Sequence, residues 1–342
     1  MTVSRALLLV NFGGPRCLEE IPEFLAALLT DRDVISTSMP PFLQTFLFRR
    51  IARKRAKKIA HDYISIGGRS PIYEDTETMA RRLAQGLNEE VLTFHRYLPA
   101  THEEFIEKIG NLQQKEILVF PMFPQFSYAT TGSIARWFET HLCGKIVRRL
   151  RWVRSYCDHP EFVASQKEKI QQFLDQHQLT HANSYLIFSA HGLPKQFVCA
   201  GDPYESECER SFEAIAAQFP KYKTKLVYQS KFGRGEWLRP YTEEVCQDVL
   251  TWHEGKETIV FVPIAFTSDH IETLFEIESQ YLPLIRERGL NAYRCPALNQ
   301  QKSWIEAILK ISASSDRLHN AMLIRRERES CCVQCKAGCC QC

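Results

Sequence analysis

The sequence predicts an α/β protein made of two similar halves, each a parallel sheet covered by helices. Four apolar runs punctuated by Gly or Pro have the length and composition of buried parallel strands. The first and third lead into a loop with Gly and Pro, and the second and fourth place Val-Phe shortly before a proline, which indicates a weak internal repeat. Amphipathic stretches between the runs are the expected covering helices. The four runs are residues 6–15, 116–124, 185–194 and 258–266.

The length of the chain favours two domains. Its 342 residues, 44% hydrophobic and 24% charged, are ordinary for a globular protein and too many for one small core. We expect an N-terminal domain over 1–155, a C-terminal domain over 156–325 with the option that its last helix packs back on the first domain, and a Cys-rich tail over 326–342. A net charge of +3 gives no reason to expect a nucleic-acid partner.

The first apolar run is expected to be a strand rather than a signal peptide, because it is short and no small-residue cleavage site follows it. The sequence has no run of roughly 20 apolar residues that would span a bilayer. Six of the 13 cysteines lie in the last twelve residues, a distribution that suggests metal binding in a reducing compartment rather than a disulfide framework. We therefore expect a cytoplasmic protein, either free or peripheral at the membrane.

Segment 40–58 passes directly from an apolar group into a basic one. Phe42, Phe46 and their apolar neighbours precede seven Arg and Lys residues. Such a segment suits peripheral contact with an anionic membrane or the lining of an apolar pocket for an anionic ligand. A helix with one buried and one solvated face explains the spacing equally well.

Two segments after predicted strands carry candidate chemistry, because ligands of open α/β sheets bind beyond the carboxyl ends of the strands. His191 ends the third run and precedes Gly-Leu-Pro, which suits a proton acceptor facing a cleft, although an ordinary hydrogen-bonded histidine fits as well. After the fourth run, Asp269 and Glu272 have the spacing of a helix capping box. That interpretation leaves Glu276 unexplained. Glu272 and Glu276 would share one helix face and form a line of carboxylates.

Several motifs in these and other segments resemble those of ferrochelatases, the lyases that insert ferrous iron into a porphyrin in the terminal step of haem biosynthesis. LIFSAHGLP at 186–194 with GDPY at 201–204 resembles the family signature, and FTSDHIETLFEIE at 266–278 resembles its second active-site motif. Further matches follow in the same order as in the family. They are NFGGP at 11–15, IGGRSPI at 66–72, HRY at 95–97, FPQFSYATTGS at 123–133 and YQSKFGRGEWLRPYTEE at 228–244.

The resemblance implies two Rossmann-like, chelatase-type domains, each a parallel four-stranded sheet flanked by helices, with a porphyrin cleft between them. It implies that His191 takes pyrrole protons or binds iron and that Glu272 is the carboxylate on the opposite wall; which of the two first contacts iron stays open. Asp269, His270 and Glu276 match supporting residues of an acidic, proton-conducting wall. The positions matching porphyrin contacts are Arg55, Tyr63, Ser70, Arg96, Tyr97, Phe12 and Phe266.

A ferrochelatase mechanism needs both strain and a base, since the inner nitrogens of a flat porphyrin are shielded and carry two protons. We expect the apolar walls to bind the bent ring better than the flat one. The neutral imidazole of His191 would then accept or relay protons while Glu272 and Glu276 hold the iron. Other interpretations are a chelatase for another metal and tetrapyrrole, and a haem or porphyrin carrier, which would need neither a base nor a line of acids.

Two departures from the family pattern bear on the substrate. Phe12 stands where relatives often have Met or Tyr, and a Tyr there is typical of relatives that use coproporphyrin III, so Phe12 favours protoporphyrin IX. Gln280 stands where an acid is expected one turn beyond Glu276, which shortens the carboxylate line.

The Cys-rich tail resembles the C-terminal ligands of relatives that carry a two-iron two-sulfur cluster. Cys332, Cys335 and Cys340 have the matching spacing, but four thiolates are needed, and the segment that supplies the fourth in animal relatives has Tyr128 here. A zinc site and an unstructured thiol-rich end are alternatives. The substitutes for the fourth ligand are Cys342, Cys339 and an internal cysteine such as Cys157.

Overall fold

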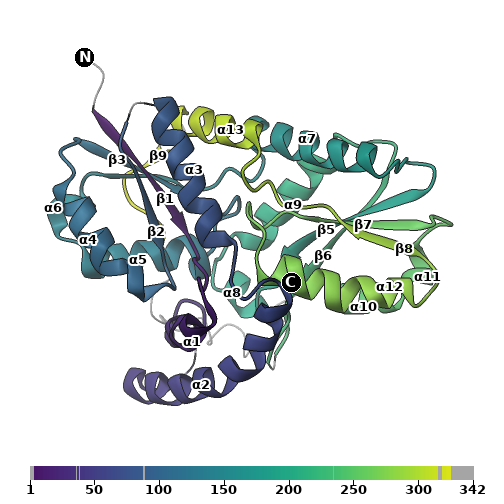
Figure 1. The fold of residues 1–342 in the computed structure, drawn as a ribbon, viewed down its shortest axis with the longest axis horizontal. Helices are drawn as coiled ribbons and strands as arrows, with labels where there is room; N and C mark the ends of the chain where they lie inside the picture. Colours follow the sequence, from purple (N-terminus) through teal and green to yellow (C-terminus); the bar gives the residue numbers. More distant parts are fainter. Residues whose placement is uncertain are drawn as a thin grey trace.

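The protein is built on two parallel-dominated sheets that lie side by side (Figure 1). The structure is a computed structural model, and it describes residues 4–35, 37, 39–87, 89–233, 235–314 and 318–324. The first sheet has the order β2-β1-β3-β4-β9 and the second the order β6-β5-β7-β8. The strands are β1 (Arg5–Asn11), β2 (Val91–His95), β3 (Glu116–Pro121), β4 (Leu150–Val153), β5 (Ser184–His191), β6 (Lys223–Gln229), β7 (Thr258–Pro263), β8 (Asn291–Arg294) and β9 (Leu318–His319).

The four predicted strands are β1, β3, β5 and β7, and all four are inner strands of their sheets. Their residues are buried almost throughout, because helices cover both faces of each sheet. The sequences of these strands are therefore continuous apolar runs rather than alternating patterns. The two halves repeat one strand order, with β1 and β5 in equivalent places. The first sheet differs from the four-stranded prediction. It gains β9 as an antiparallel edge strand, and a strand of two residues leaves no periodic pattern in a sequence.

Helices cover the faces of both sheets, and in the first half further helices lie beyond its sheet (Figure 1). Two segments are π-helices, η3 (Tyr128–Gly132) and η4 (Glu272–Tyr281). The α-helices are α1 (Ile21–Thr30), α2 (Pro41–Ser65), α3 (Ile72–Leu87), α4 (His102–Asn111), α5 (Ser133–His141), α6 (Gly144–Val147), α7 (Pro160–Gln176), α8 (Lys195–Cys199), α9 (Tyr204–Ala216), α10 (Thr242–Gln247), α11 (Val249–Trp252), α12 (Leu282–Arg286) and α13 (Lys302–Ala313).

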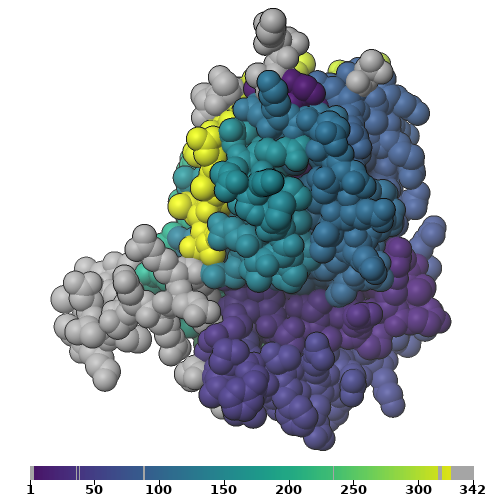
Figure 2. Space-filling model, turned by 90° about the vertical axis from the view of Figure 1, so that its left-hand side faces the viewer, coloured from purple at the N-terminus to yellow at the C-terminus, as the bar shows by residue number. Residues whose placement is uncertain are grey.

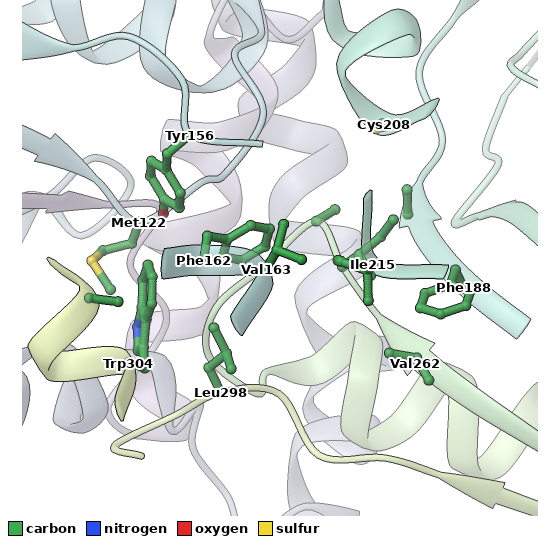
Figure 3. Packing of buried hydrophobic residues seen from close by; sticks show 14 of the residues in the cluster. Met122, Tyr156, Phe162, Val163, Phe188, Cys208, Ile215, Val262, Leu298 and Trp304 are labelled. Carbon is green, nitrogen blue, oxygen red and sulfur yellow. The ribbon is translucent and has the colours of Figure 1, made fainter. Parts of the chain in front are cut away.

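One hydrophobic cluster runs through both halves (Figure 3). Trp304 of α13 is fully buried and its ring centroid lies 6.1 Å from that of Phe120 in β3 and 6.0 Å from that of Phe162 in α7. The same cluster includes Phe188 of β5 and Val262 of β7. Helix α13 therefore packs against residues of both sheets. Because this one cluster joins the two halves, the domain boundary near residue 155 stays a prediction.

Buried hydrogen bonds also join the halves. The side-chain Nε2 of Gln125 donates to Oγ of Ser211 at 2.7 Å, and the backbone N–H of Phe126 donates to the carboxylate of Glu207 at 2.7 Å. Ser127 donates to the carboxylate of Asp202 at 2.9 Å, so the GDPY motif anchors the start of η3. These bonds fix the carboxyl ends of the two sheets relative to each other.

Helices α1 and α2 lie below the first sheet in Figure 1, and in the space-filling view the purple and dark blue atoms of this part of the chain form a layer at the bottom (Figure 2). They pack on each other through a small core that includes Phe24, Ala52 and Tyr63. The start of α2 leaves Phe42 76% exposed and Phe46 61% exposed. Within the described ranges, no helix combines the length and apolar character needed to cross a bilayer.

Candidate active site

His191 ends β5 and is held by its neighbours on both sides. Its Nδ1 lies 2.5 Å from the carbonyl oxygen of Gly192, and its own carbonyl accepts the hydroxyl of Tyr204 at 3.0 Å. Because a carbonyl only accepts, Nδ1 carries a proton and Nε2 points outward. Gly192 is required here, since a Cβ at this position would lie 2.7 Å from the carbonyl oxygen of Gln229. The strand end thus presents one imidazole nitrogen in a fixed direction.

Glu272 is the first residue of η4 and lies between two imidazoles. Its Oε1 is 3.3 Å from Nε2 of His191, and its Oε2 is 3.3 Å from Nε2 of His270. The side chains of His191 and Glu272 remain 28% and 27% exposed, whereas His270 is buried. His191 and Glu272 are therefore in direct contact in this structure, and their placement on opposite walls around a bound ring stays a prediction.

Glu276 follows four residues later and is held by hydroxyl groups. Its Oε1 accepts the hydroxyl of Tyr281 at 2.6 Å, and its Oε2 accepts the hydroxyl of Ser230. Ser230 has a φ of 64°, a conformation that costs a non-glycine residue free energy and is common at functional sites. The line of carboxylates therefore exists, but on a π-helix whose wider turn the sequence pattern did not predict.

The charges of this site are coupled through Glu272. Burial lowers the pKa of His191, but the charge and hydrogen bond of Glu272, the charge of Glu276 and the Gly192 carbonyl outweigh it and raise that pKa to about 9. Burial opposes the charge of Glu272, yet the imidazoles of His191 and His270 hold its pKa well below the usual range. Burial and the charge of Glu272 raise the pKa of Glu276. Without iron and porphyrin, His191 and Glu272 therefore form an imidazolium–carboxylate pair at neutral pH. This differs from the neutral imidazole expected from the sequence.

Asp269 lies one turn before Glu272 and serves as an anchor. Its Oδ1 accepts from Arg294 at 2.7 Å and from the hydroxyl of Thr273 at 2.9 Å, and its Oδ2 accepts from Asn299 at 2.8 Å. Both oxygens are thus engaged within the second half. Asp269 therefore fixes the start of η4, and its role on a proton-conducting wall stays a prediction.

Aromatic rings from both halves meet beside the acidic helix. Phe12 follows β1, and its ring centroid lies 6.5 Å from that of Phe266 after β7 and 4.5 Å from that of Tyr97. Phe266 in turn lies 4.2 Å from the ring of His270. The predicted residues Phe12, Tyr97, Phe266 and His270 therefore belong to one apolar patch at the carboxyl ends of the sheets.

Arg96 and Tyr97 are held by Asp31, which the sequence analysis did not identify. Asp31 accepts from the Arg96 guanidinium at 2.7 Å, from the Tyr97 hydroxyl at 2.9 Å and from Ser133 at 2.5 Å. These polar groups therefore face a buried carboxylate, and Tyr97 offers its ring to the aromatic patch. Nothing in the sequence around Asp31 signals this role.

The remaining predicted porphyrin contacts lie on or beside α2 and α3. Tyr63 is buried, and burial together with the charge of Glu272 raises its pKa, so its phenol stays protonated. Ser70 is buried against Gly14, and its backbone N–H donates to the carbonyl of Pro15 at 2.8 Å. Arg55 is exposed on the surface of α2. Tyr63 thus joins the site by its closeness to Glu272, whereas Arg55 lies on the outer side.

The site offers groups for a cation and for protons rather than a closed metal cage. Across the described parts of the chain, no group of three or more His, Cys, Asp and Glu side chains is arranged to hold a metal ion. Cys332, Cys335, Cys340 and Cys342 lie outside the described residues. Cys157 is fully buried, and burial raises the pKa of its thiol to about 11.

Comparisons with known proteins agree on one family. The ferrochelatase family model matches residues 4–315. The ferrochelatase of Chlamydia abortus is 44% identical over 318 residues, covering 93% of this chain and 98% of that protein. The ferrochelatase of Chlamydia trachomatis serovar D is 44% identical over 308 residues, covering 90% of this chain and 95% of that protein.

Solved structures with similar folds include chelatases. CbiX, described as the terminal enzyme of sirohaem biosynthesis in denitrifying bacteria, superposes with a TM-score of 0.50 at 12% identity, covering 90% of this chain and 97% of that chain. A multi-domain Deinococcus radiodurans protein with similarity to chelatases gives a TM-score of 0.53 at 14% identity, covering 91% of this chain and 55% of that chain. These likenesses confirm the predicted two-domain α/β fold.

Proposed function

The chain belongs to the ferrochelatase family, and we propose that the pair formed by His191 and Glu272 is the place where it metallates its porphyrin. As an enzyme of this family, it inserts ferrous iron into a porphyrin ring to form haem. The observation that supports this location is the juxtaposition of the pair with Glu276 and with the aromatic patch around Phe12 and Phe266.

The reaction replaces two pyrrole protons by one Fe²⁺ ion, so both protons must be carried away. In the protein alone, His191 holds a proton against Glu272, and this proton must leave before the imidazole accepts another. Approach of Fe²⁺ to the pair drives that proton off, as metal binding does at imidazole ligands. We assign Glu276, whose pKa is raised and which is only partly buried, to accept the protons from the pair one at a time and to release each to solvent before the next arrives. Tyr281 and Ser230 hold Glu276 in place for this transfer.

The iron insertion assay tests this proposal. Ferrous iron and porphyrin are mixed with the protein without oxygen, and the loss of porphyrin fluorescence is followed over many turnovers. His191→Ala is expected to lose iron insertion while its unfolding transition stays cooperative. Near-normal turnover of that variant would refute the assignment. A porphyrin carrier would change the fluorescence once, in proportion to the protein, and would not turn over.

We propose protoporphyrin IX as the substrate. Phe12 packs between Tyr97 and Phe266 and offers no oxygen or sulfur atom to the ring centre. This environment is apolar, which suits a porphyrin with two propionates better than one with four. Side-by-side assays with protoporphyrin IX and coproporphyrin III test the choice, and a higher kcat/KM with coproporphyrin III would reverse it.

We propose that the start of α2 rests on an anionic membrane surface. Phe42 and Phe46 are exposed, and the same helix continues with Arg49, Arg50 and Arg53. Apolar side chains followed by cations match the boundary between acyl chains and anionic headgroups. Co-sedimentation with vesicles containing anionic lipid is expected for the native chain and not for a Phe42→Ser, Phe46→Ser variant.

The matched control for that experiment is Leu250→Ser, which removes a 57% exposed apolar side chain elsewhere on the surface. Equal vesicle binding by both variants, or binding to neutral vesicles alone, would contradict the proposal.

We propose an iron–sulfur cluster whose ligands all come from the cysteines of the tail. Tyr128 places a phenol where the fourth thiolate is expected, and its hydroxyl lies 3.4 Å from the carbonyl of Gly201. The internal Cys157 is buried. The described residues therefore do not complete the ligand set at these positions. Iron, sulfide and zinc analysis of anaerobically purified protein, with its visible spectrum, distinguishes a cluster, a zinc site and metal-free thiols.

A further inference from the structure

A buried contact between the two halves holds the loop that leads into η4. The hydroxyl of Ser268 donates to Oδ2 of Asp75, 193 residues away in the sequence. Both side chains are buried. Asp75 lies in the first turn of α3 in the first half, and Ser268 lies four residues before Glu272 in the second half. A side chain of one half therefore reaches the segment that carries the reacting carboxylate of the other.

The same loop is tied to the first half at a second point. The hydroxyl of Thr267 donates to the carbonyl of Met122 at 3.1 Å. Asp269, the residue after Ser268, is bonded to Arg294 and Asn299 within its own half. The loop is thus fixed to the first half at two consecutive residues and to the second half at the third.

The first turn of α3 also supports the facing aromatic residue. Thr76 accepts a hydrogen bond from Nδ2 of Asn11 at 2.9 Å, and Asn11 directly precedes Phe12. Phe12 meets Phe266, which directly precedes the loop. Two adjacent residues of α3 therefore hold the segments on both sides of the aromatic patch.

Burying the carboxylate of Asp75 lowers the stability of the folded protein, which a position with only a structural role does not require. Burial raises its pKa to about 6, in spite of hydrogen bonds from Ser268 and Gln300, and the charge of Asp269 adds to the rise. Apolar residues of similar size often stabilise such buried positions better than a charged group does. A carboxylate kept here at a cost in stability points to a role in the site.

We propose that Asp75 is a positioning residue for iron insertion, which holds Ser268 and thereby sets Glu272 at its distance from His191. This proposal rests on the function proposed above for the His191–Glu272 pair. Asp75 itself touches neither member of the pair. Its effect is on the geometry of the reacting groups and not on the apolar walls that bind the flat ring, so it acts on kcat rather than on KM.

The test compares Asp75→Ala, Ser268→Ala and the double variant in steady-state assays with protoporphyrin IX and ferrous iron. A displacement of a reacting group by about 1 Å costs about 100-fold in rate, so kcat is expected to fall about 10- to 100-fold. KM for the porphyrin is expected to stay within about threefold, because flat-ring binding needs no such precision. The double variant should be no slower than the slower single variant, since both remove one contact.

Two further variants complete the design. Asp75→Asn keeps an acceptor oxygen for Ser268 and is expected to recover most of the lost kcat. Glu74→Gln removes a neighbouring carboxylate that is exposed and pairs with Arg81, and it should match the native chain. A kcat of Asp75→Ala equal to that of Glu74→Gln would overturn the proposal. So would a rise in KM with unchanged kcat.

Amide hydrogen exchange provides a readout that does not depend on turnover. In Asp75→Ala and Ser268→Ala, residues 267–276 should exchange faster than in the native chain while the amides of β5 keep their protection. Unchanged exchange over 267–276 would refute the positioning role. Absence of turnover by the native chain would instead refute the proposed function, and the exchange comparison would still decide whether the contact holds the loop. Ser268→Ala removes one hydroxyl only and serves if Asp75→Ala fails to fold.

Discussion

Replacing Glu272 by Gln should convert His191 from an imidazolium to a neutral imidazole at neutral pH. Burial alone lowers the pKa of His191, and the charge and hydrogen bond of Glu272 are the main influences that raise it from 6.5 to about 9. Without them, burial is opposed only by the smaller effects of Glu276 and the Gly192 carbonyl, so the pKa should fall well below 9. The net rise of about 2.5 units corresponds to about 3 kcal/mol in favour of the charged imidazole in the folded protein, summed over burial and all neighbouring groups. This is an upper limit, because solvent screens a pair whose side chains are 28% and 27% exposed.

The sign of the effect on stability follows from the direction of each pKa shift. Since the pKa of His191 is raised in the folded protein, the pair contributes stability that is fully present below pH 6.5 and is lost as the pH rises through about 9. The pKa of Glu272 is lowered, so its contribution is present above 4.5 and is lost in strong acid. The native chain should therefore be more stable than Glu272→Gln near pH 6, and the difference should vanish above about pH 9.

Nuclear magnetic resonance of ring-labelled histidine, titrated without iron or porphyrin, measures the pKa directly. Glu278→Gln is the matched control, because Glu278 lies on the same helix but pairs with Arg294 at 2.7 Å. The control should leave the titration of His191 near 9. A native His191 that titrates at or below 6.5, or a Glu272→Gln variant that still titrates near 9, would refute the reasoning.

Three other substitutions test separate features. Trp304→Ala opens a cavity among fully buried aromatic rings and should lower the free energy of unfolding by about 3–5 kcal/mol in urea denaturation; a loss below about 1 kcal/mol would contradict the packing. Gly14→Ala places a Cβ 2.6 Å from the Cβ of Ser70, so it should lower the melting temperature and weaken porphyrin binding measured by fluorescence titration. Asp75→Asn removes a carboxyl whose pKa is raised from 3.8 to about 6 in the folded protein. The substitution should therefore stabilise the protein by up to about 3 kcal/mol above pH 6 and have no such effect below pH 3.8. Urea unfolding of both proteins at the two pH values would show the difference.

The strands, and the placement of His191 and Phe12 at their carboxyl ends, could be predicted because both depend on local composition. β1, β3, β5 and β7 are buried on both faces, and continuous apolar runs are what such strands require. The parallel order then places the ends of these strands at one edge, where His191 and Phe12 lie.

The partners that define the site could not be predicted in the same way. Asp31, Ser230 and Tyr281 act through contacts with residues distant in the sequence or through a turn of unusual width. An α-helix and a π-helix place Glu272 and Glu276 on similar faces, so the carboxylate spacing does not separate the two. The direct contact of His191 and Glu272 likewise depends on how the loop before η4 is tied to both halves.

Strand β9, which follows the second half in the sequence, completes the sheet that contains β1. Helix α13 packs on α3 and β3, and β9 pairs with β4, so the N-terminal sheet lacks a covering helix and an edge strand until the ribosome has released residues beyond 319. The N-terminal half therefore emerges with part of its core uncovered during translation. Such long-range closure slows folding and leaves apolar surface of the first half exposed until the contacts form.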